Sequence, residues 1–263
     1  MPDEAFLEIS GLSKHYRAVK AVSAFDARME NGKIYGLIGT NGAGKTTVIN
    51  MISGLEKPNT GSILFEGREI SGQAPEKIAR RGIARTFQNL RLFSTMTVLD
   101  NVLVAAQIDR TYSIFSTVIK SPKYRREDAA ERAWAMKLLE ILELSQYAAA
   151  ASSSLPYGHQ RRLEIARALA TRPKLLLLDE PAAGMNPQES ADLMTVIRRI
   201  RDEFSITILL IEHDMKVVMG VCEYIYAMTF GEIIDQGAPE DIVKSQKVIE
   251  AYLGGASKRA NAQ

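Results

Sequence analysis

Residues 34–47 read Ile34-Tyr35-Gly36-Leu37-Ile38-Gly39-Thr40-Asn41-Gly42-Ala43-Gly44-Lys45-Thr46-Thr47. An apolar segment of strand length leads into a glycine-rich turn, and a helical pattern follows from Lys45. The turn from Gly39 to Thr46 fits G-x-x-x-x-G-K-[ST], and its two neighbours are the elements that this pattern requires. The alternative is a glycine-rich turn that binds nothing, and the lysine, threonine and helix together argue against it. The stretch therefore predicts a phosphate-binding loop.

Each residue type in this loop has a chemical task. Glycines allow successive backbone N–H groups to point at phosphate oxygens, and the following helix directs the positive end of its dipole to the same place. Lys45 reaches the β- and γ-phosphates as a point charge. The hydroxyl of Thr46 is placed to bind Mg²⁺, and Thr47 can help hold the α-phosphate. The residues expected to contact the nucleotide are Gly39, Thr40, Asn41, Gly42, Ala43, Gly44, Lys45, Thr46 and Thr47.

A second motif supplies two carboxylates. Residues 175–178 are four leucines that predict a buried strand, and Asp179 and Glu180 follow at its carboxyl end. Ligand sites in sheets of this kind lie at that edge. Asp179 is placed to hold Mg²⁺, directly or through water, and Glu180 is placed to act as general base on an attacking water. Two solvated acids at a strand end are the alternative, and the nearby phosphate loop argues against it.

Strands and helices alternate along most of the chain, which predicts an α/β fold with a largely parallel central sheet. Residues 89–156 are mainly helical in pattern, and we expect an inserted helical subdomain there, with an irregular stretch at 109–123. A helix at 124–144 carries Ala133, Met136, Leu139 and Leu142 at helical spacing. We expect residues 255–263 to form a disordered tail. The expected strands are 6–9, 21–28, 34–38, 62–65, 83–87, 174–179, 206–212, 224–228 and 232–235. The other expected helices begin at 45 or span 97–107, 187–204, 215–221, 239–244 and 247–253.

The length, net charge and cysteine content of the chain limit the classes of function that it can have. At 263 residues it is long enough for one large domain with a subdomain. A net charge of +2 predicts neither a nucleic-acid partner nor a charged membrane surface. Cys222 is the only cysteine, so no internal disulfide can form, and we expect a small packed side chain there. The N-terminus lacks a secretory pattern, and no apolar stretch approaches the ~20 residues that cross a bilayer. We therefore expect any membrane association to depend on partner proteins.

Three further elements occur at places that fit these two motifs. Gln88 follows the expected strand 83–87, at the start of the helical insert. His213 follows the strand that comes after the acidic one. The segment Leu155-Pro156-Tyr157-Gly158-His159-Gln160 precedes a helix and lies upstream of the acidic strand. It resembles the Leu-Ser-Gly-Gly-Gln signature of ABC ATPases, and with five motifs in the right order the chain resembles that family from Phe6 to Gly254.

The resemblance implies a fold and a mode of assembly. The fold is a P-loop NTPase core of the RecA type with a mixed, largely parallel sheet, an N-terminal antiparallel β subdomain and an inserted helical subdomain. The core would span about 1–88 and 157–254, and the helical subdomain about 89–156. Two such cassettes close head to tail, so that the signature of one caps the ATP that the other holds.

The resemblance also implies roles for single residues. Tyr16 would stack on adenine, with an ordinary core-edge tyrosine as the alternative. Gln88 would sense Mg²⁺ and the attacking water, and His213 would contact the γ-phosphate. ATP and Mg²⁺ are the implied ligands, with Thr46, Gln88 and Asp179 around the metal.

Further segments narrow the resemblance. Residues 87–93, 157–167, 180–187 and 248–254 look like those of branched-chain amino-acid importers, and among their two ATPases the chain is similar to the longer one. This implies two transmembrane permeases, which we expect to dock near 88–98 with Arg91, Leu92 and Phe93 as candidate contacts. Internal packing of these three side chains is the alternative.

The same resemblance implies a setting for the chain. A periplasmic or extracellular solute-binding protein would be an indirect partner, and no nucleic acid is expected. The chain would be peripheral, at the cytoplasmic face of the inner or plasma membrane. The motifs leave open an ATPase of another ABC transporter, such as an exporter or a lipid-extraction system. A soluble ABC protein that acts on nucleic acid or ribosomes is a third reading, which the single cassette and the lack of basic tracts argue against.

Three positions depart from the family pattern. Pro156 stands where the signature serine donates a hydroxyl to the partner's γ-phosphate, and proline has neither a hydroxyl nor an N–H. His159 replaces the signature glutamine, and Asn186 stands where many members have an aspartate. Either these changes are harmless, or the chain works in a heterodimer whose two ATP sites hydrolyse unequally. We favour the heterodimer as a hypothesis and keep the homodimer as its alternative.

Overall fold

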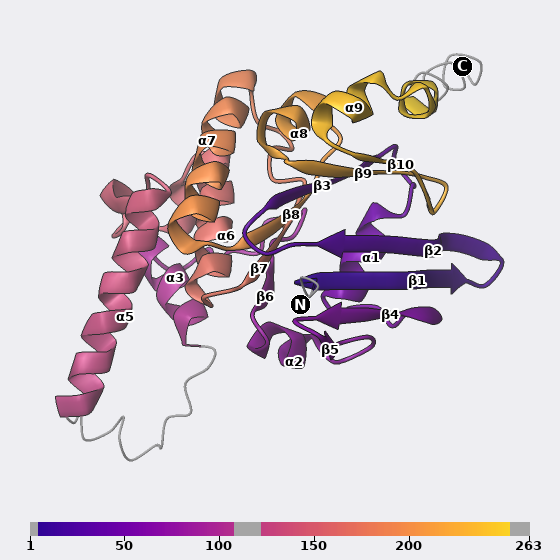
Figure 1. Ribbon diagram of the computed structural model, residues 1–263. Coiled ribbons are helices and arrows are strands. Elements are labelled where there is room, and N and C mark those ends of the chain that lie inside the picture. Colours follow the sequence, from indigo (N-terminus) through magenta and orange to yellow (C-terminus); the bar gives the residue numbers. More distant parts are fainter. Residues whose placement is uncertain (1–4, 108–121, 253–263) are drawn as a thin grey trace.

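Two β-sheets form the centre of the structure, a computed structural model that describes residues 5–107 and 122–252 (Figure 1). The first is antiparallel and has the strand order β2-β1-β4-β5. The second has the order β10-β9-β3-β8-β7-β6, in which all neighbours are parallel except the pair β10–β9. The first sheet contains β1 (Leu7–Tyr16), β2 (Val19–Met29), β4 (Thr60–Phe65) and β5 (Arg68–Glu69). The second contains β3 (Ile34–Gly39), β6 (Ile83–Arg85), β7 (Leu175–Asp179), β8 (Thr207–Ile211), β9 (Tyr224–Thr229) and β10 (Glu232–Gly237).

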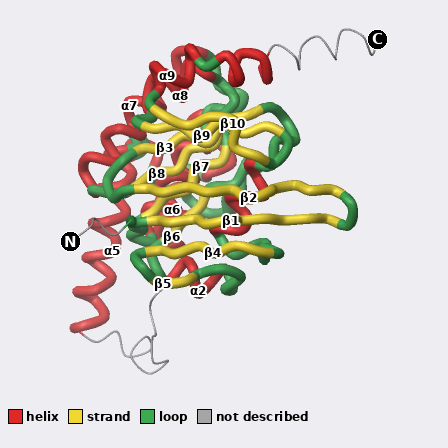
Figure 2. Tube along the Cα trace, turned by 45° about the vertical axis from the view of Figure 1, so that its right-hand side comes forward, coloured by secondary structure: helices red, strands yellow, loops and turns green. Residues whose placement is uncertain are grey.

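The central strands β3, β7 and β8 are buried along their whole length. Successive side chains of a strand point to opposite faces, so each strand contributes to two cores. Ile38, Leu178 and Leu210 join one core, which also includes side chains of the helices from α3 to α8. Leu37 and Leu177 join the other core, with the antiparallel sheet and α1. The parallel sheet is therefore covered on both faces, as Figure 2 shows, and the predicted fold class is confirmed.

The helices that cover the sheet match the expected pattern closely. Three begin and end where the sequence predicts, namely α7 (Pro187–Phe204), α8 (Met215–Val221) and α9 (Pro239–Lys244). The others are α1 (Lys45–Ile52), α2 (Pro75–Arg80), α3 (Val98–Ala106), α5 (Pro122–Ile141) and α6 (Tyr157–Ala170). Two short 3₁₀ turns, η1 (Ser145–Tyr147) and η2 (Ser152–Ser154), lead into α6. Helices α3, α5, α6 and α7 gather on one side of the sheet (left in Figure 1).

Some expectations about elements were wrong. Helix α2 was not expected, β1 extends from Leu7 to Tyr16 instead of ending at residue 9, and β6 ends at Arg85 instead of 87. Residues 122–123 are helical instead of irregular, whereas 109–121 and the expected tail 255–263 lie outside the described residues. A helix at 246–252 replaces the expected 247–253 as far as the structure describes it.

The predicted buried face of α5 also needs correction. Ala133 is exposed, and the buried side chains of α5 and the residue after it are Ala135, Leu138, Leu139, Ile141 and Leu142. A spacing of three residues throughout falls short of the 3.6 residues of a helical turn, so the predicted set drifts around the helix. In the observed set Ala135, Leu138 and Leu142 follow one another at intervals of three and four residues, and Leu139 and Ile141 lie beside them, so the set stays on one broad face.

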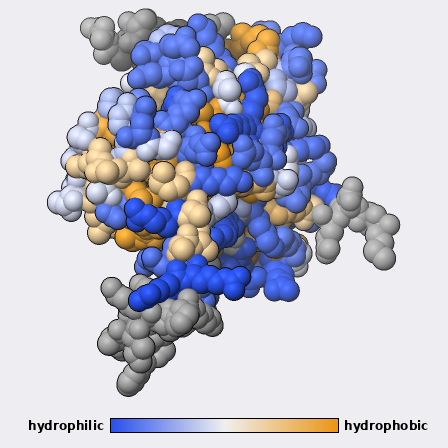
Figure 3. Space-filling model, turned by 90° about the vertical axis from the view of Figure 1, so that its left-hand side faces the viewer, coloured by the Kyte–Doolittle hydropathy of each residue, from blue (hydrophilic) through white to orange (hydrophobic). Residues whose placement is uncertain are grey.

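No helix in the described residues is long and apolar enough to cross a membrane. Figure 3 shows the side of the molecule that is on the left in Figure 1, and its described surface is mainly hydrophilic with small apolar patches.

The start of α7 depends on a capping box. The Asn186 side-chain oxygen accepts from the Glu189 backbone N–H at 2.9 Å, and the Glu189 carboxylate accepts from the Asn186 backbone N–H at 2.9 Å. Asn186 therefore has a structural task that an aspartate performs equally well.

We predict that Asn186→Ala lowers the free energy of unfolding by about 1 kcal/mol, because the Glu189 backbone N–H loses its side-chain acceptor. Asn186→Asp should leave the free energy of unfolding unchanged. Urea denaturation followed by circular dichroism measures both variants. Equal unfolding midpoints for Asn186→Ala and the unaltered chain would contradict the capping role.

Candidate active site

The carboxyl ends of the parallel strands bring the predicted site residues together. Leu37 of β3 pairs with Ile211 of β8, and Ile211 pairs with Asp179 of β7. Parallel strands in register end at one edge of the sheet, where ligands of such folds bind. The phosphate loop, the two carboxylates and His213 each follow directly after one of these strand ends.

Two glycines let the phosphate loop lie close to other backbone segments. A Cβ at Gly39 would lie 2.3 Å from the Met228 carbonyl oxygen, and one at Gly44, where φ is +102°, would lie 2.4 Å from the Ala21 carbonyl oxygen. Any side chain would collide with backbone at both places, so only glycine fits there. The sequence pattern of the loop is therefore required by the fold around it as well as by phosphate.

The loop folds around the side chain of Lys45. The Lys45 Nζ donates to the carbonyl oxygens of Gly39 at 2.7 Å and of Thr40 at 3.1 Å. Burial lowers the pKa of Lys45, while the carboxylates of Glu180, Asp179 and Glu212 act in the opposite direction. The ammonium is thus held at the loop and faces three acids, which suits a group that transfers its contacts to phosphate oxygens.

Three predicted catalytic residues meet beside the loop. The Gln88 side-chain amide donates to Glu180 Oε2 at 2.9 Å. His213 Nδ1 lies 3.8 Å from Glu180 Oε1. Glu180 has a left-handed backbone (φ +48°), which is strained for a non-glycine residue, and its N–H donates to the Ile211 carbonyl oxygen at 2.9 Å. Residues that are far apart in the sequence thus form one cluster around a carboxylate.

Oxygen donors that suit Mg²⁺ lie at the same edge. Thr46 is exposed in the first turn of α1, Asp179 ends β7 and Gln88 follows β6. Mg²⁺ prefers oxygen ligands and takes only a few from the protein when phosphates are present. Among the described residues no three His, Cys, Asp or Glu side chains gather as a metal cage. Thr46, Asp179 and Gln88 offer a hydroxyl, a carboxylate and an amide oxygen, and this donor set fits a Mg²⁺ that is shared with nucleotide phosphates.

The signature segment begins helix α6. Pro156 is the residue that precedes the helix, with an extended backbone, and Gly158 is buried in the first turn. The Gln160 side chain donates to the Leu155 carbonyl oxygen at 2.8 Å, and the His159 ring meets the Tyr147 ring edge to face at 5.2 Å. Gln160 and His159 are thus occupied within their own chain.

Tyr16 ends β1 at the margin of the site. Its side chain is 42% exposed and lies beside Thr47 at the start of α1. The Lys14 ammonium lies 5.2 Å from the centre of its ring. An exposed ring next to the phosphate loop can stack on a base, and the adenine contact of Tyr16 stays a prediction.

A family model for ABC transporters matches residues 22–183, which span the phosphate loop through the two carboxylates. The chain belongs to the ABC transporter family. It is 44% identical over 95% of its length to the high-affinity branched-chain amino acid transport ATP-binding protein BraF of Pseudomonas aeruginosa, of which it covers 98%. It is 43% identical over 96% of its length to the protein of the same description, LivG, of Escherichia coli K12, of which it covers 99%.

A solved structure supports the same assignment. The ADP conformation of an ATP-binding cassette of an ABC transporter superposes with a TM-score of 0.83 at 31% sequence identity, over 95% of this chain and 99% of that one. The chain is therefore an ABC ATPase cassette that binds nucleotide, and the RecA-like core predicted from the resemblance is confirmed.

Sequence reasoning missed Glu212, a buried carboxylate behind the site. Its Oε1 accepts from the Ala182 backbone N–H at 2.9 Å, and its Oε2 accepts from the His213 backbone N–H at 3.2 Å. Burial raises the pKa of Glu212. Glu212 thus fixes the segment after Glu180 to the segment that carries His213. The buried run before it suggests a strand end, but nothing in the sequence indicates its two backbone partners.

Sequence reasoning also missed Arg161 of α6. Its guanidinium donates to the Phe87 carbonyl oxygen at 2.9 Å and also contacts the carbonyl oxygen of Gln88. The Tyr157 hydroxyl accepts from the same guanidinium at 2.7 Å. Arg161 therefore connects the segment that carries Gln88 to the helix that begins with the signature.

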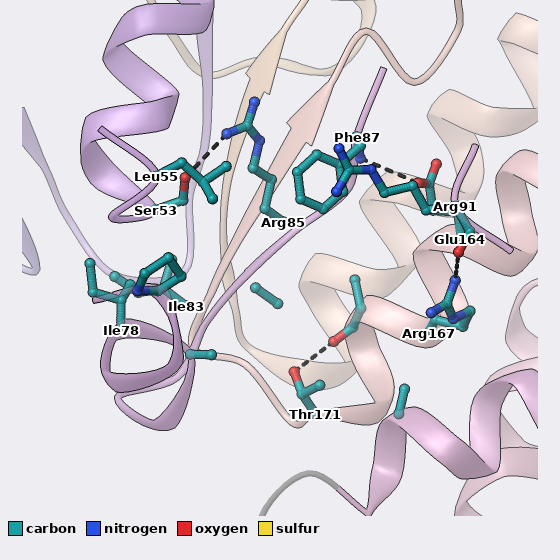
Figure 4. Close-up of a pocket in the computed structure, with 15 residues that line it drawn as sticks. Ser53, Leu55, Ile78, Ile83, Arg85, Phe87, Arg91, Glu164, Arg167 and Thr171 are labelled. Atoms are coloured by element: carbon teal, nitrogen blue, oxygen red, sulfur yellow. Dashed lines mark hydrogen bonds between the residues drawn. The ribbon is translucent and has the colours of Figure 1, made fainter. Parts of the chain in front are cut away.

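A cleft of about 350 Å³ opens between strand β6 at the edge of the parallel sheet and the helices α3 and α6 (Figure 4). One wall comes from the segment after α1, from α2 and from β6, and the other comes from α3 and α6. The Arg91 guanidinium lies 4.0 Å from the centre of the Phe87 ring, and both side chains line the cleft.

Of the three predicted docking residues, only Arg91 lines the cleft. Leu92 packs against the core on the helical side of the sheet, and the Phe93 ring centre lies 4.8 Å from the Arg167 guanidinium. Residues that define the cleft are Leu55, Ile78, Ile83, Phe87, Arg91 and Arg167.

We predict that Glu180→Gln lowers the rate of ATP hydrolysis by ~10²–10⁴-fold, the range that a positioned general base contributes. ATP binding should persist, because Lys45 and the loop are unaltered. Steady-state phosphate release and equilibrium binding of a fluorescent ATP analogue measure the two quantities. Glu240→Gln, an exposed change in α9, is the matched control and should hydrolyse ATP normally. Undiminished hydrolysis by Glu180→Gln would show that the base lies elsewhere.

Proposed function

We propose that the cassette hydrolyses ATP with Mg²⁺ to drive the uptake of branched-chain or related amino acids, as the ATP-binding subunit of an importer. The observation that carries this proposal is the identity of 43–44%, over nearly the full length of both chains, to two proteins named for that transport. The cluster of Lys45, Glu180 and His213 supports it, because this set of groups suits phosphoryl transfer to water.

The groups at the sheet edge have distinct tasks in this reaction. Lys45 and the N–H groups of the loop bind the β- and γ-phosphates, which orients the γ-phosphorus. Glu180 takes a proton from the attacking water while the new P–O bond forms, and the bond from the γ-phosphorus to the bridging oxygen breaks to leave ADP. Gln88 holds the Glu180 carboxylate at 2.9 Å, and His213 donates to the γ-phosphate.

Mg²⁺ would be held by Thr46, Asp179 and Gln88. When it is bound it offsets the charge that builds up on the phosphate oxygens. The residues of the chain supply its oxygen donors and place the nucleotide against Glu180.

A second ABC ATPase subunit completes each ATP site in this proposal. Among the described residues no hydrogen bond joins 155–160 to the phosphate loop, so within one chain the signature has no contact of this kind with the nucleotide site. Head-to-tail closure would bring the signature of one cassette to the ATP of the other. Because Pro156 has no donor and His159 replaces the signature glutamine, we propose a heterodimer in which this chain's ATP is capped by an intact signature and the partner's ATP by a weaker one. A homodimer is the alternative.

Pro156→Ser should accelerate ATP hydrolysis at the partner's site, by up to about 10²-fold, because one preorganised donor is restored to the developing charge. The assembled transporter is assayed for phosphate release. Pro239→Ser, at the first turn of α9, is the matched control for the change of residue type. Equal rates for Pro156→Ser and the unaltered transporter would contradict the asymmetry.

Two transmembrane permeases are the proposed membrane partners, and they would hold the cassette at the cytoplasmic face of the inner or plasma membrane. A short permease helix would enter the cleft that Phe87 and Arg91 line. The cleft has apolar walls and three arginines, Arg85, Arg91 and Arg167, against one acid, Glu164, so an apolar segment with a carboxylate suits it. A solute-binding protein on the other side of the membrane would deliver the amino acid.

Vesicles that contain the assembled transporter should accumulate radiolabelled leucine when ATP and Mg²⁺ are supplied on the side of the cassettes. Arg91→Glu should reduce this accumulation more than it reduces ATP hydrolysis, because the reversed charge weakens the contact through which the permease responds. Arg68→Glu, an exposed change on β5, should alter neither. ATP hydrolysis without accumulation of any branched-chain amino acid would contradict the proposed solute class.

A further inference from the structure

Arg85, the last residue of β6, forms a buried ion pair with Asp179. Its Nη2 lies 2.9 Å from Asp179 Oδ2, and the two side chains are only 7% and 5% exposed. Charges that leave water at such a site need a partner, because the loss of hydration is otherwise uncompensated. In the free cassette Arg85 is therefore the counter-ion of Asp179.

Helix α1 and the residue after it fix the orientation of Arg85. Its Nη1 donates to Asn50 Oδ1 at 2.7 Å and to Ser53 Oγ at 3.1 Å. The Arg85 Nε is buried, and it finds no acceptor among the residues that the structure describes. Two donors are thus satisfied at α1 and one at Asp179, while a fourth is left unmet. A buried donor without a partner costs free energy, so stability alone does not account for an arginine here.

The Asp179 carboxylate is also the proposed ligand of Mg²⁺. Asp179 ends β7 at the edge where the nucleotide binds, and it is the carboxylate that the proposed function assigns to Mg²⁺. A guanidinium within 3 Å of a metal ligand repels a divalent cation at that ligand. Metal binding at Asp179 must therefore take place against the charge of Arg85.

We propose that Arg85 is a positioning residue that neutralises Asp179 until Mg²⁺ binds, and that its charge sets the Mg²⁺ concentration at which the site fills. This inference rests on the proposed function, because the Mg²⁺ site at Asp179 is part of it. Arg85 orients the carboxylate through one oxygen and weakens its attraction for the metal at the same time.

The position of Arg85 also allows a group bound in the cleft to affect the metal site. Arg85 lines the cleft, and its guanidinium lies 5.1 Å from the centre of the Phe87 ring, which contacts Arg91 (Figure 4). A carboxylate that entered the cleft would compete with Asp179 for Arg85. Occupation of the cleft would then raise the affinity of Asp179 for Mg²⁺, which gives a permease a route to the nucleotide site.

The test is a Mg²⁺ titration of the whole cassette at a fixed ADP concentration, read as the shift of the thermal unfolding midpoint. Removal of the positive charge in Arg85→Met should lower the half-saturating Mg²⁺ concentration about tenfold. Arg85→Gln, which removes the charge but keeps a polar side chain, should shift it in the same direction and covers the case in which Arg85→Met does not fold. Arg85→Lys keeps the charge and should titrate close to the unaltered chain. Mn²⁺ binding followed by electron paramagnetic resonance gives a second reading of the same quantity.

A matched control separates metal competition from loss of a buried arginine. Arg162 is also buried and pairs with Glu143 in another part of the cassette, so Arg162→Met should lower the unfolding midpoint without changing the Mg²⁺ response. An unchanged or raised half-saturating Mg²⁺ concentration in both neutral Arg85 variants would overturn the inference and leave the proposed function intact. If Asp179→Asn has the same half-saturating Mg²⁺ concentration as the unaltered chain, Asp179 does not bind the metal. In that case the proposed metal site and this inference are both wrong.

Discussion

The parallel register of β3, β8 and β7 decides where the phosphate loop, the two carboxylates and His213 lie. Because Leu37 pairs with Ile211 and Ile211 with Asp179, the segments that follow the three strands leave the sheet at one edge. The fully buried side chains of these strands hold that register, since a slip of one residue would turn each apolar face away from its core. Glu180 can therefore adopt a strained backbone and still meet Gln88 and His213, because the sheet on which it stands is rigid.

A network of charged side chains connects this edge to the rest of the cassette. Arg161 links the backbone before and at Gln88 to the signature helix, and Glu212 links the segments that follow β7 and β8. Arg85 lies between the metal ligand Asp179 and the cleft. Arg161 and Arg85 each join a surface that would meet a partner to a group that would meet the nucleotide, and Glu212 holds together the two segments that carry Glu180 and His213. The arrangement suits a motor subunit, in which binding at one surface must change the chemistry at another.

The sequence alone predicted those parts of the site in which neighbouring residues act together. The phosphate loop and the pair Asp179–Glu180 belong to this class, because a strand, a turn and the residue types of a short motif define them. Contacts between residues far apart in the sequence could not be predicted from it. Arg85 and Asp179 are 94 positions apart, and no periodicity indicates that they pair. The same holds for Arg161, whose contact with Phe87 spans 74 positions.

Errors in the predicted elements have similar causes. Strand β6 stops at Arg85 because the Asp179 backbone N–H donates to the Thr86 hydroxyl, at 3.3 Å, instead of to a backbone carbonyl of β6. Helix α2 was missed because Ala74, which precedes it, offers no side-chain cap that marks a helix start. The face of α5 was misplaced by a spacing rule that ignored the 3.6-residue turn. In each case tertiary contacts or exact helical geometry decided a detail that composition left open.

The measurement that tests this account most directly is the structure of the Glu180→Gln cassette with ATP and Mg²⁺, together with its partner cassette. The account predicts that the triphosphate lies on Lys45 and the loop of one cassette, with Gln88 and His213 beside the γ-phosphate and the signature of the other cassette over it. A triphosphate bound away from this sheet edge, or bound there with no second cassette over it when both subunits are present, would contradict the account.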